Sequence, residues 1–143
     1  MPPATNTELK NFLDQWRDDA NGCKQVFLHL KSHIAALSDI ELNFVARPGV
    51  TYSLRAARTD RTDRALFALI DMIDENPRWL SVCFYKDLVS DPEELGDLVP
   101  GGIMGEDGYC FDVESQDPAF TNYLCRRIDE ARENNSPRAA NPF

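Results

Sequence analysis

The sequence predicts an α+β domain, a two-layer sandwich in which N-terminal and C-terminal helices pack on a mainly antiparallel sheet of about five strands. Apolar residues recur at helical spacing near both ends of the chain and alternate with polar residues in the middle. Short turn signals separate the alternating segments, which is typical of strands that pair with their sequence neighbours. The length of 143 residues fits one domain, which we expect to span residues 1–133.

Two amphipathic helices are expected at the start of the chain. Thr5 and Glu8 have the spacing of a capping box, and apolar residues then recur at helical intervals. Asn21-Gly22 predicts the end of this helix, because glycine readily adopts the left-handed conformation that follows a helix. A second helix is expected from about residue 23 to residue 37.

Four strands are expected in the middle of the chain. Residues 40–47 and 50–56 alternate between apolar and polar, and Pro48-Gly49 between them predicts a hairpin turn. Residues 65–73 and 79–86 are two further apolar segments of strand length. Because the segments are joined by short turns, they predict an antiparallel meander.

The last third of the chain contains two signals for the start of a helix. Asp91-Pro92 and Asp117-Pro118 each combine an N-cap residue with proline at the first helical position. We expect a short helix after the first and a long final helix after the second, with a short fifth strand at residues 109–113 between them. Residues 134–143 are polar and rich in proline and predict a flexible tail.

This order of elements, over residues 8–133, resembles that of small bacterial α+β domains of the YdhG-like kind. The hairpin, the pair of hydrophobic strands and the terminal helix carry the resemblance. It implies a compact α+β domain of unassigned activity, and it carries no set of functional residues to this chain.

The charge of the chain is strongly uneven. The formal net charge is −9, which argues against general binding of nucleic acid, since affinity for a polyanion depends on cationic side chains. Residues 87–117 contain ten acidic residues and no lysine or arginine, so the rest of the chain is nearly neutral. An acidic surface of this kind favours docking to a basic partner.

The start of the chain and its cysteines predict a cytoplasmic protein. Residues 1–10 lack the apolar core of a secretory signal, and no apolar run approaches the roughly 18 residues of a membrane helix. Cys23, Cys83, Cys110 and Cys125 are far apart and form no CxxC pair. We interpret them as buried free thiols, with disulfides, metal binding or catalysis as the alternatives.

A glycine-rich segment is the most unusual feature of the sequence. Four glycines within eight residues, Gly101 and Gly102 among them, allow a backbone to approach a ligand closely. The segment lacks the lysine of a phosphate-binding loop, and Glu106 and Asp107 would repel an anion. It is either a tight connection or a loop that contacts a ligand or partner, together with Tyr109.

Arginines recur around the predicted hairpin. Arg47 and Arg55 flank Tyr52 and are candidates for binding a carboxylate or phosphate through their guanidinium groups. The alternative is that the arginines of this region pair within the chain, because Asp60 and Asp63 interrupt the following loop.

A pocket between the sheet and the helices is the second candidate site. Tyr52, Arg55, Asp71 and Tyr109 would line it, and burial of Asp71 would shift its pKa. The alternative for Asp71 is a position in solvent or at a turn.

Metal binding and catalysis have little support in the sequence. His29 and His33 share a helix face but lack an HExxH pattern, and the acidic residues near Asp112 lack the spacing of an EF-hand loop. No GxSxG motif is present, and Cys83 lies within a strand. We therefore expect no metal and no cofactor.

Together these features predict a non-enzymatic binding or protein-interaction module that uses the acidic, glycine-rich segment 87–117. The alternative is a small-molecule-binding protein or enzyme. A protein partner or a small ligand is expected, nucleic acid and membrane are not, and association as a homodimer stays open.

Overall fold

The computed structural model describes residues 3–17 and 19–137, which form one antiparallel sheet of six strands and three α-helices. Along the chain the elements are α1 (Pro3–Gln15), α2 (Cys23–Ala35), β1 (Ile40–Arg47), β2 (Thr51–Arg58), β3 (Leu66–Ile73), β4 (Trp79–Tyr85), the 3-10 turn η1 (Lys86–Leu88), β5 (Asp97–Ile103), β6 (Glu106–Val113) and α3 (Pro118–Asn134). The predicted α+β class and the antiparallel sheet are confirmed, with six strands instead of about five.

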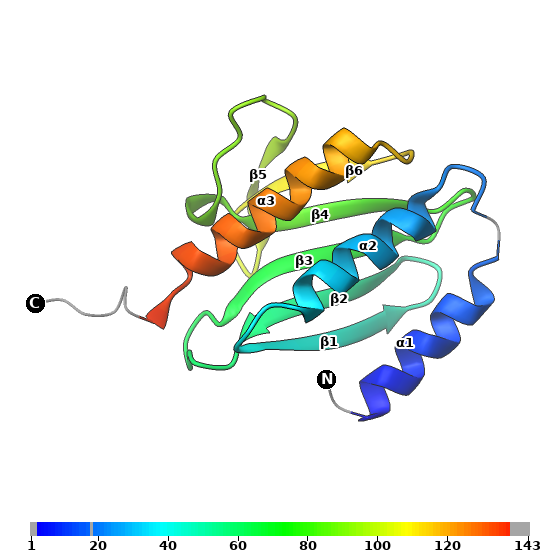
Figure 1. The fold of residues 1–143 in the computed structure, drawn as a ribbon, viewed down its shortest axis with the longest axis horizontal. Coiled ribbons are helices and arrows are strands. Elements are labelled where there is room, and N and C mark those ends of the chain that lie inside the picture. Colours follow the sequence, from blue (N-terminus) through cyan, green and yellow to red (C-terminus); the bar gives the residue numbers. More distant parts are fainter. Residues whose placement is uncertain (1–2, 18, 138–143) are drawn as a thin grey trace, which may run out of the picture.

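The strands lie in the order β1-β2-β3-β4-β6-β5, and every neighbouring pair is antiparallel. The first four strands form the predicted meander. The last two form a hairpin whose second strand, β6, pairs with β4, so that β5 is an edge strand (Figure 1).

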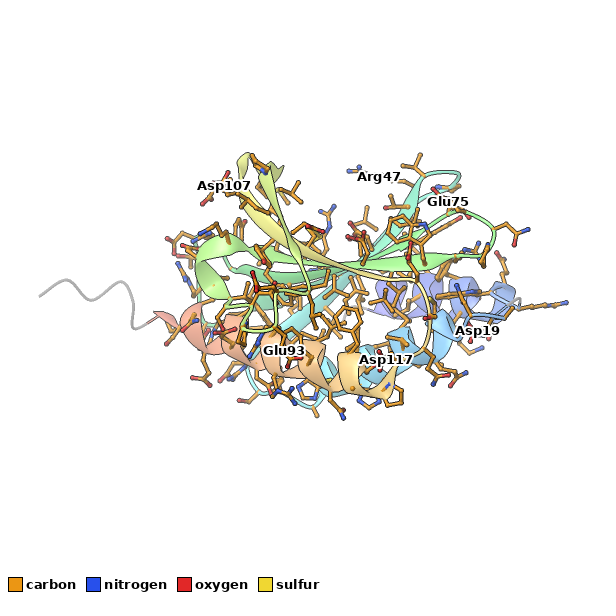
Figure 2. The ribbon with its side chains drawn as sticks, turned by 90° about the horizontal axis from the view of Figure 1, so that it is seen from above. Asp19, Arg47, Glu75, Glu93, Asp107 and Asp117 are labelled. Atoms are coloured by element: carbon orange, nitrogen blue, oxygen red, sulfur yellow. A yellow bond between two sulfur atoms is a disulfide. The ribbon has the colours of Figure 1, made fainter. Side chains whose placement is uncertain are left out.

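The two faces of the sheet differ in what covers them. The helices lie together over one face, and the opposite face carries no helix (Figures 1 and 2). A cross-strand row of buried side chains lies on the helix-covered face: Phe44, Leu54, Ile70, Val82 and Phe111. Because side chains alternate along a strand, the residues next to each of these point to the helix-free face.

The first helix ends earlier than the sequence predicts. α1 begins at Pro3 and stops at Gln15, before the expected end at Asn21-Gly22. Gly22 instead precedes α2, with a φ of 79°, and a Cβ there would lie 2.6 Å from Cβ of Gln116. The Gln116 N–H donates to the carbonyl of Asn21 at 2.8 Å. Asn21-Gly22 therefore joins the start of α2 to the segment before α3.

The helix expected after Asp91-Pro92 is absent from the described chain, and that prediction was wrong. The Asp91 carboxylate accepts hydrogen bonds from the N–H groups of Leu95 and Gly96, at 3.0 and 2.9 Å, which closes a loop. It also accepts from the hydroxyls of Tyr109, at 2.6 Å, and Tyr123. Asp91 thus ties the loop to β6 and α3, and its side chain is not available as a helix N-cap.

This hydrogen bonding predicts an acid-dependent loss of stability. Partial burial raises the pKa of Asp91, but the hydrogen bonds from the two tyrosines and the two N–H groups outweigh it and lower the pKa from 3.8 to about 2. A carboxyl whose pKa is lower in the folded state stabilises the fold above its unfolded pKa. That stabilisation, about 2 kcal/mol, is lost as the pH falls from about 4 to about 2.

Asp91→Asn tests this expectation. Urea unfolding of the wild type and the variant should differ most near neutral pH and converge as the pH falls toward about 2, because the variant has no carboxyl to protonate. A difference in stability that stays constant over that range would contradict it.

The final helix begins as predicted but extends further. Asp117 caps α3 by accepting from the N–H groups of Ala119 and Phe120, at 3.1 and 3.4 Å. Asn134 and Asn135 lie in the predicted tail, but the Asn134 side chain donates to the carbonyl of Leu88 at 2.8 Å, and Asn135 is fully buried. Residues 138–143 of that tail lie outside the described residues.

The prediction of free thiols holds for two cysteines and is wrong for the other two. Cys83 on β4 and Cys110 on β6 form a disulfide, whereas Cys23 and Cys125 are free and buried. The strand register places Cys83 directly opposite Cys110, with a Cα–Cα distance of 4.2 Å, although 27 residues separate them in sequence. Burial raises the pKa of Cys23 to about 11, with Asp19 and Glu114 adding to it, which makes this thiol a poor nucleophile.

The described helices are also informative about membranes. None of them combines the length and the apolar character that crossing a bilayer requires.

Candidate functional site

A cavity of about 380 Å³, called the trough here, lies on the helix-free face of the sheet. Figure 2 shows two hairpins rising from this face, with Asp107 on β5–β6 and Arg47 on β1–β2, and the sheet forming the floor between them. The polar side chains of the trough are Arg47, Thr51, Ser53, Arg55 and Asp71. Its apolar side chains, called the apolar wall, are Val45, Leu69, Ile103 and Met104, and Gly102 lies with them.

The strand register sets the positions of the three charged side chains. Asp71 on β3 is opposite Ser53, and Arg55 on β2 is opposite Leu69, one step along the same face. Arg47 on β1 is opposite Thr51, one step in the other direction. The two arginines, called the arginine pair, therefore occupy the rows on either side of Asp71.

The arginine pair forms no direct ion pair within the part of the chain that the structure describes. Neither Arg47 nor Arg55 forms an ion pair with any carboxylate in residues 3–17 and 19–137; Arg55 Nε donates only a long hydrogen bond, 3.4 Å, to Ser53 Oγ. The expected pairing within the chain is found instead for two other arginines. Arg58 pairs with Asp60 at 2.8 Å, and Arg61 pairs with Asp63 at 3.4 Å. Two guanidinium groups are thus left to face the trough.

Asp71 is half-buried in the trough and lies within β3, not at a turn. Burial raises the pKa of its carboxyl, and the Ser53 hydroxyl and the positive charges of Arg55 and Arg47 oppose only part of that effect. A buried carboxyl of this kind gains most from a ligand group that donates hydrogen bonds or carries positive charge.

The β5–β6 hairpin forms one side of the trough, and its glycines set the backbone conformation of the hairpin. Its two-residue turn places Met104 and Gly105 at positive φ, 50° and 81°, the pattern of a type I′ turn. A Cβ on Gly102 would lie 2.5 Å from Cγ1 of Val99, so a larger residue there would displace the strand. Ile103 is 4% exposed and packs on Gly108.

Two of the predicted site residues lie on the other side of the sheet. Tyr52 packs against Phe12, with ring centroids 4.3 Å apart, in the helix-covered core. Tyr109 also points to that side, where its hydroxyl donates to Asp91. The sheet separates both tyrosines from Arg55 and Asp71, so the four residues do not form one pocket between sheet and helices.

The remaining predicted residues lie on the β5–β6 hairpin, outside the trough lining except for Gly102. Glu106 pairs with Arg64 at 3.3 Å. Asp107 accepts from the N–H of Gly101 at 3.2 Å, and Gly101 has a φ of 66°. These contacts give the glycine and the carboxylates roles in shaping the hairpin.

The acidic segment 87–117 does not present one continuous free carboxylate surface. Five of its ten acidic side chains are held by partners within the described chain: Asp87, Asp91, Glu106, Asp107 and Asp117. Half of the acidic side chains of the segment are therefore engaged within the fold: two pair with Arg64, and the others accept hydrogen bonds from nearby groups.

Sequence reasoning missed most of the uncharged lining. Val45 and Ser53 lie two residues from Arg47 and Arg55, so strand alternation could have placed them on the same face. Ile103 and Met104 had no such signal, because the sequence did not predict β5.

A metal centre finds no support in the described residues, where no group of three or more histidine, cysteine, aspartate or glutamate side chains is arranged to hold an ion. Of the two histidines singled out, His33 is engaged with Asp129, with Nε2 2.7 Å from Oδ1.

The comparisons with known proteins do not add to these observations. No family model matches the chain, and no curated protein and no solved structure matches it. The YdhG-like resemblance stays a prediction, and the residues of the trough are the basis for a function.

Proposed function

We propose that this protein binds a small molecule with a carboxylate group in the trough. The observation that carries the proposal is the arginine pair, two guanidinium groups without an ion-pair partner in the described chain that line one cavity of about 380 Å³. A guanidinium group matches a carboxylate with two parallel hydrogen bonds, and the cavity has the size of a small-ligand site.

The charge of the trough supports an anionic group on the ligand. The chain as a whole carries −9, so its surface repels anions in general. The trough instead combines two arginines with one carboxyl, Asp71, whose pKa is raised by burial. Its local charge is positive, and the apolar wall offers the remaining contact area.

We propose binding without catalysis. The described lining contains no histidine, lysine or cysteine, so the usual partners of an activated nucleophile are absent from it. Asp71 would then act as a recognition group.

Arg55→Ala tests the proposal. In calorimetric titration with short-chain aliphatic carboxylates, the wild type should bind saturably and the variant about tenfold more weakly or worse, because a charge-assisted hydrogen bond is lost. The melting temperature should be nearly unchanged, since Arg55 has no ion pair to lose. Arg126→Ala, which removes an exposed arginine from α3, is the matched control. Unchanged affinity in Arg55→Ala would contradict the proposal.

As a second function, we propose that the acidic segment 87–117 is a surface that binds a protein partner. One observation favours it. Four large apolar side chains of the acidic segment are exposed, and three lie on the hairpin of the edge strand: Leu95, Leu98, Val99 and Met104. The charge of the segment favours a basic, extended partner that pairs with β5. A lysine-rich peptide should bind the wild type and not a Leu98→Ser, Val99→Ser variant; equal binding would count against this surface.

A further inference from the structure

Resting on the proposed carboxylate site, we propose that the ligand is a free α-amino acid with an apolar side chain. Its carboxylate binds the arginine pair, its ammonium group binds Asp71, and its side chain packs on the apolar wall.

The spacing of the charges is the first argument. Arg55 and Asp71 are diagonal neighbours on adjacent strands, in positions whose Cα atoms are typically about 7–8 Å apart. Both line the same cavity. A single ligand that contacts both must carry its negative and positive groups close together, and an α-amino acid carries them on one carbon.

The second argument is charge balance inside the trough. A ligand with a carboxylate alone would meet the arginine pair but would also be repelled by an ionised Asp71. An ammonium group on the ligand offsets that repulsion by attracting Asp71. It also gives the half-buried Asp71 carboxyl a direct ion pair, which it does not have within the described chain. Each charged group of the ligand then has an opposite charge in the protein.

The third argument is the apolar wall. Two of its members, Ile103 and Met104, belong to the β5–β6 hairpin, and Leu69 lies on the floor next to Arg55 in register. Contacts with aliphatic side chains on both floor and hairpin favour an aliphatic side chain on the ligand over a charged one. A peptide fits this arrangement less well, because its terminal charges lie on different residues.

Three probes separate the parts of this ligand. L-leucine carries both charged groups, 4-methylpentanoate has the same carbon skeleton without the ammonium group, and 3-methylbutylamine lacks the carboxylate. In calorimetric titration of the full chain, leucine should bind at least about tenfold more tightly than 4-methylpentanoate, and the amine should not bind measurably.

Two variants assign the charged groups. Asp71→Asn should abolish the preference for leucine over 4-methylpentanoate, while Arg55→Ala should weaken the binding of both. Asp112→Asn is the matched control, because it removes a carboxylate from the same row of the sheet face but outside the trough lining. Melting temperatures of all three variants show whether each still folds.

The pH dependence supplies a second readout. The charged groups that face Asp71 are Arg55 on β2 and Arg47 on β1; Ser81 on β4 and residues 102–104 of the hairpin do not titrate. Burial raises the pKa of the Asp71 carboxyl. As the pH rises and Asp71 loses its proton, leucine should bind more tightly and 4-methylpentanoate more weakly. Opposite pH responses of the two affinities are expected only if the ligand's ammonium group contacts Asp71. If both affinities change with pH in the same direction, this contact is excluded.

The outcomes distinguish this inference from the function on which it rests. If 4-methylpentanoate binds as tightly as leucine and Arg55→Ala weakens both, the amino-acid assignment fails and the carboxylate site stands. If L-glutamate binds more tightly than leucine, the apolar side chain is the part that fails. If none of the probes binds, both proposals fail.

Discussion

Phe111→Ala is expected to lower the free energy of unfolding by about 3–5 kcal/mol, because it removes a large buried ring and leaves a cavity. Phe111 on β6 is fully buried on the helix-covered face. Its ring centroid lies between 5.5 and 6.5 Å from those of four other aromatic rings: Phe84, Tyr109, Phe120 and Tyr123. These partners come from β4, β6 and α3, so the cavity would lie where the sheet meets the last helix.

Urea unfolding followed by tryptophan fluorescence measures this loss. The matched control is Leu98→Ala on the neighbouring strand β5, where the side chain is 46% exposed and the expected change is within about 0.5 kcal/mol. A change below about 1 kcal/mol for Phe111→Ala would mean that Phe111 and the four rings around it are not tightly packed.

Reduction of the disulfide is expected to have the second-largest effect, a loss of about 3.5 kcal/mol. Cys83 and Cys110 are 27 residues apart, and the link removes the corresponding freedom from the unfolded chain. Since Asp97 also pairs with Cys110, the loss should be accompanied by faster amide exchange at the junction of β4, β6 and β5. Urea unfolding with and without reductant measures it.

The link itself can be tested by alkylation in denaturant. Two cysteines should react without reductant and all four after reduction, and a Cys83→Ala, Cys110→Ala variant should show no response of its stability to reductant. Cys125→Ser is the control, because this residue is a free, buried thiol and its removal should leave the response intact. Four reactive thiols in the untreated protein would restore the original expectation of free cysteines.

The part of the fold that the sequence predicts well is the part governed by periodicity. β1 and β2 were predicted almost residue for residue, because apolar alternation and the Pro48-Gly49 turn act locally and agree with each other. α3 was predicted from Asp117-Pro118 for the same reason: its N-cap hydrogen bonds involve only the next residues of the chain.

The errors arise where distant residues decide the local structure. Asp91-Pro92 has the sequence of a helix start, but Tyr109 and Tyr123, 18 and 32 residues away, bind its carboxylate. β5 contains Pro100 and two glycines, which normally argue against a strand, and it is tolerated because an edge strand need not donate every N–H to a neighbour.

The candidate site shows the same division. Arg47, Arg55 and Asp71 were singled out from residue type, and the structure does bring them to one cavity. Tyr52 was assigned with them although it lies three residues from Arg55 on the same strand, β2. Side chains alternate along a strand, so residues an odd number of positions apart point to opposite faces. The hairpin that closes the trough could not be anticipated without β5.

The alternation in β2 and β3 has a consequence for how this protein tolerates change. Leu54 and Ile70 are packed under the helices, whereas their sequence neighbours Ser53, Arg55 and Asp71 line an open cavity. A saturation scan scored for abundance should therefore alternate between intolerant and tolerant positions along each strand, and a scan scored for ligand binding should show the complementary pattern. If the trough binds the proposed ligand, its selectivity can change over generations through one set of positions while the other set keeps the chain folded.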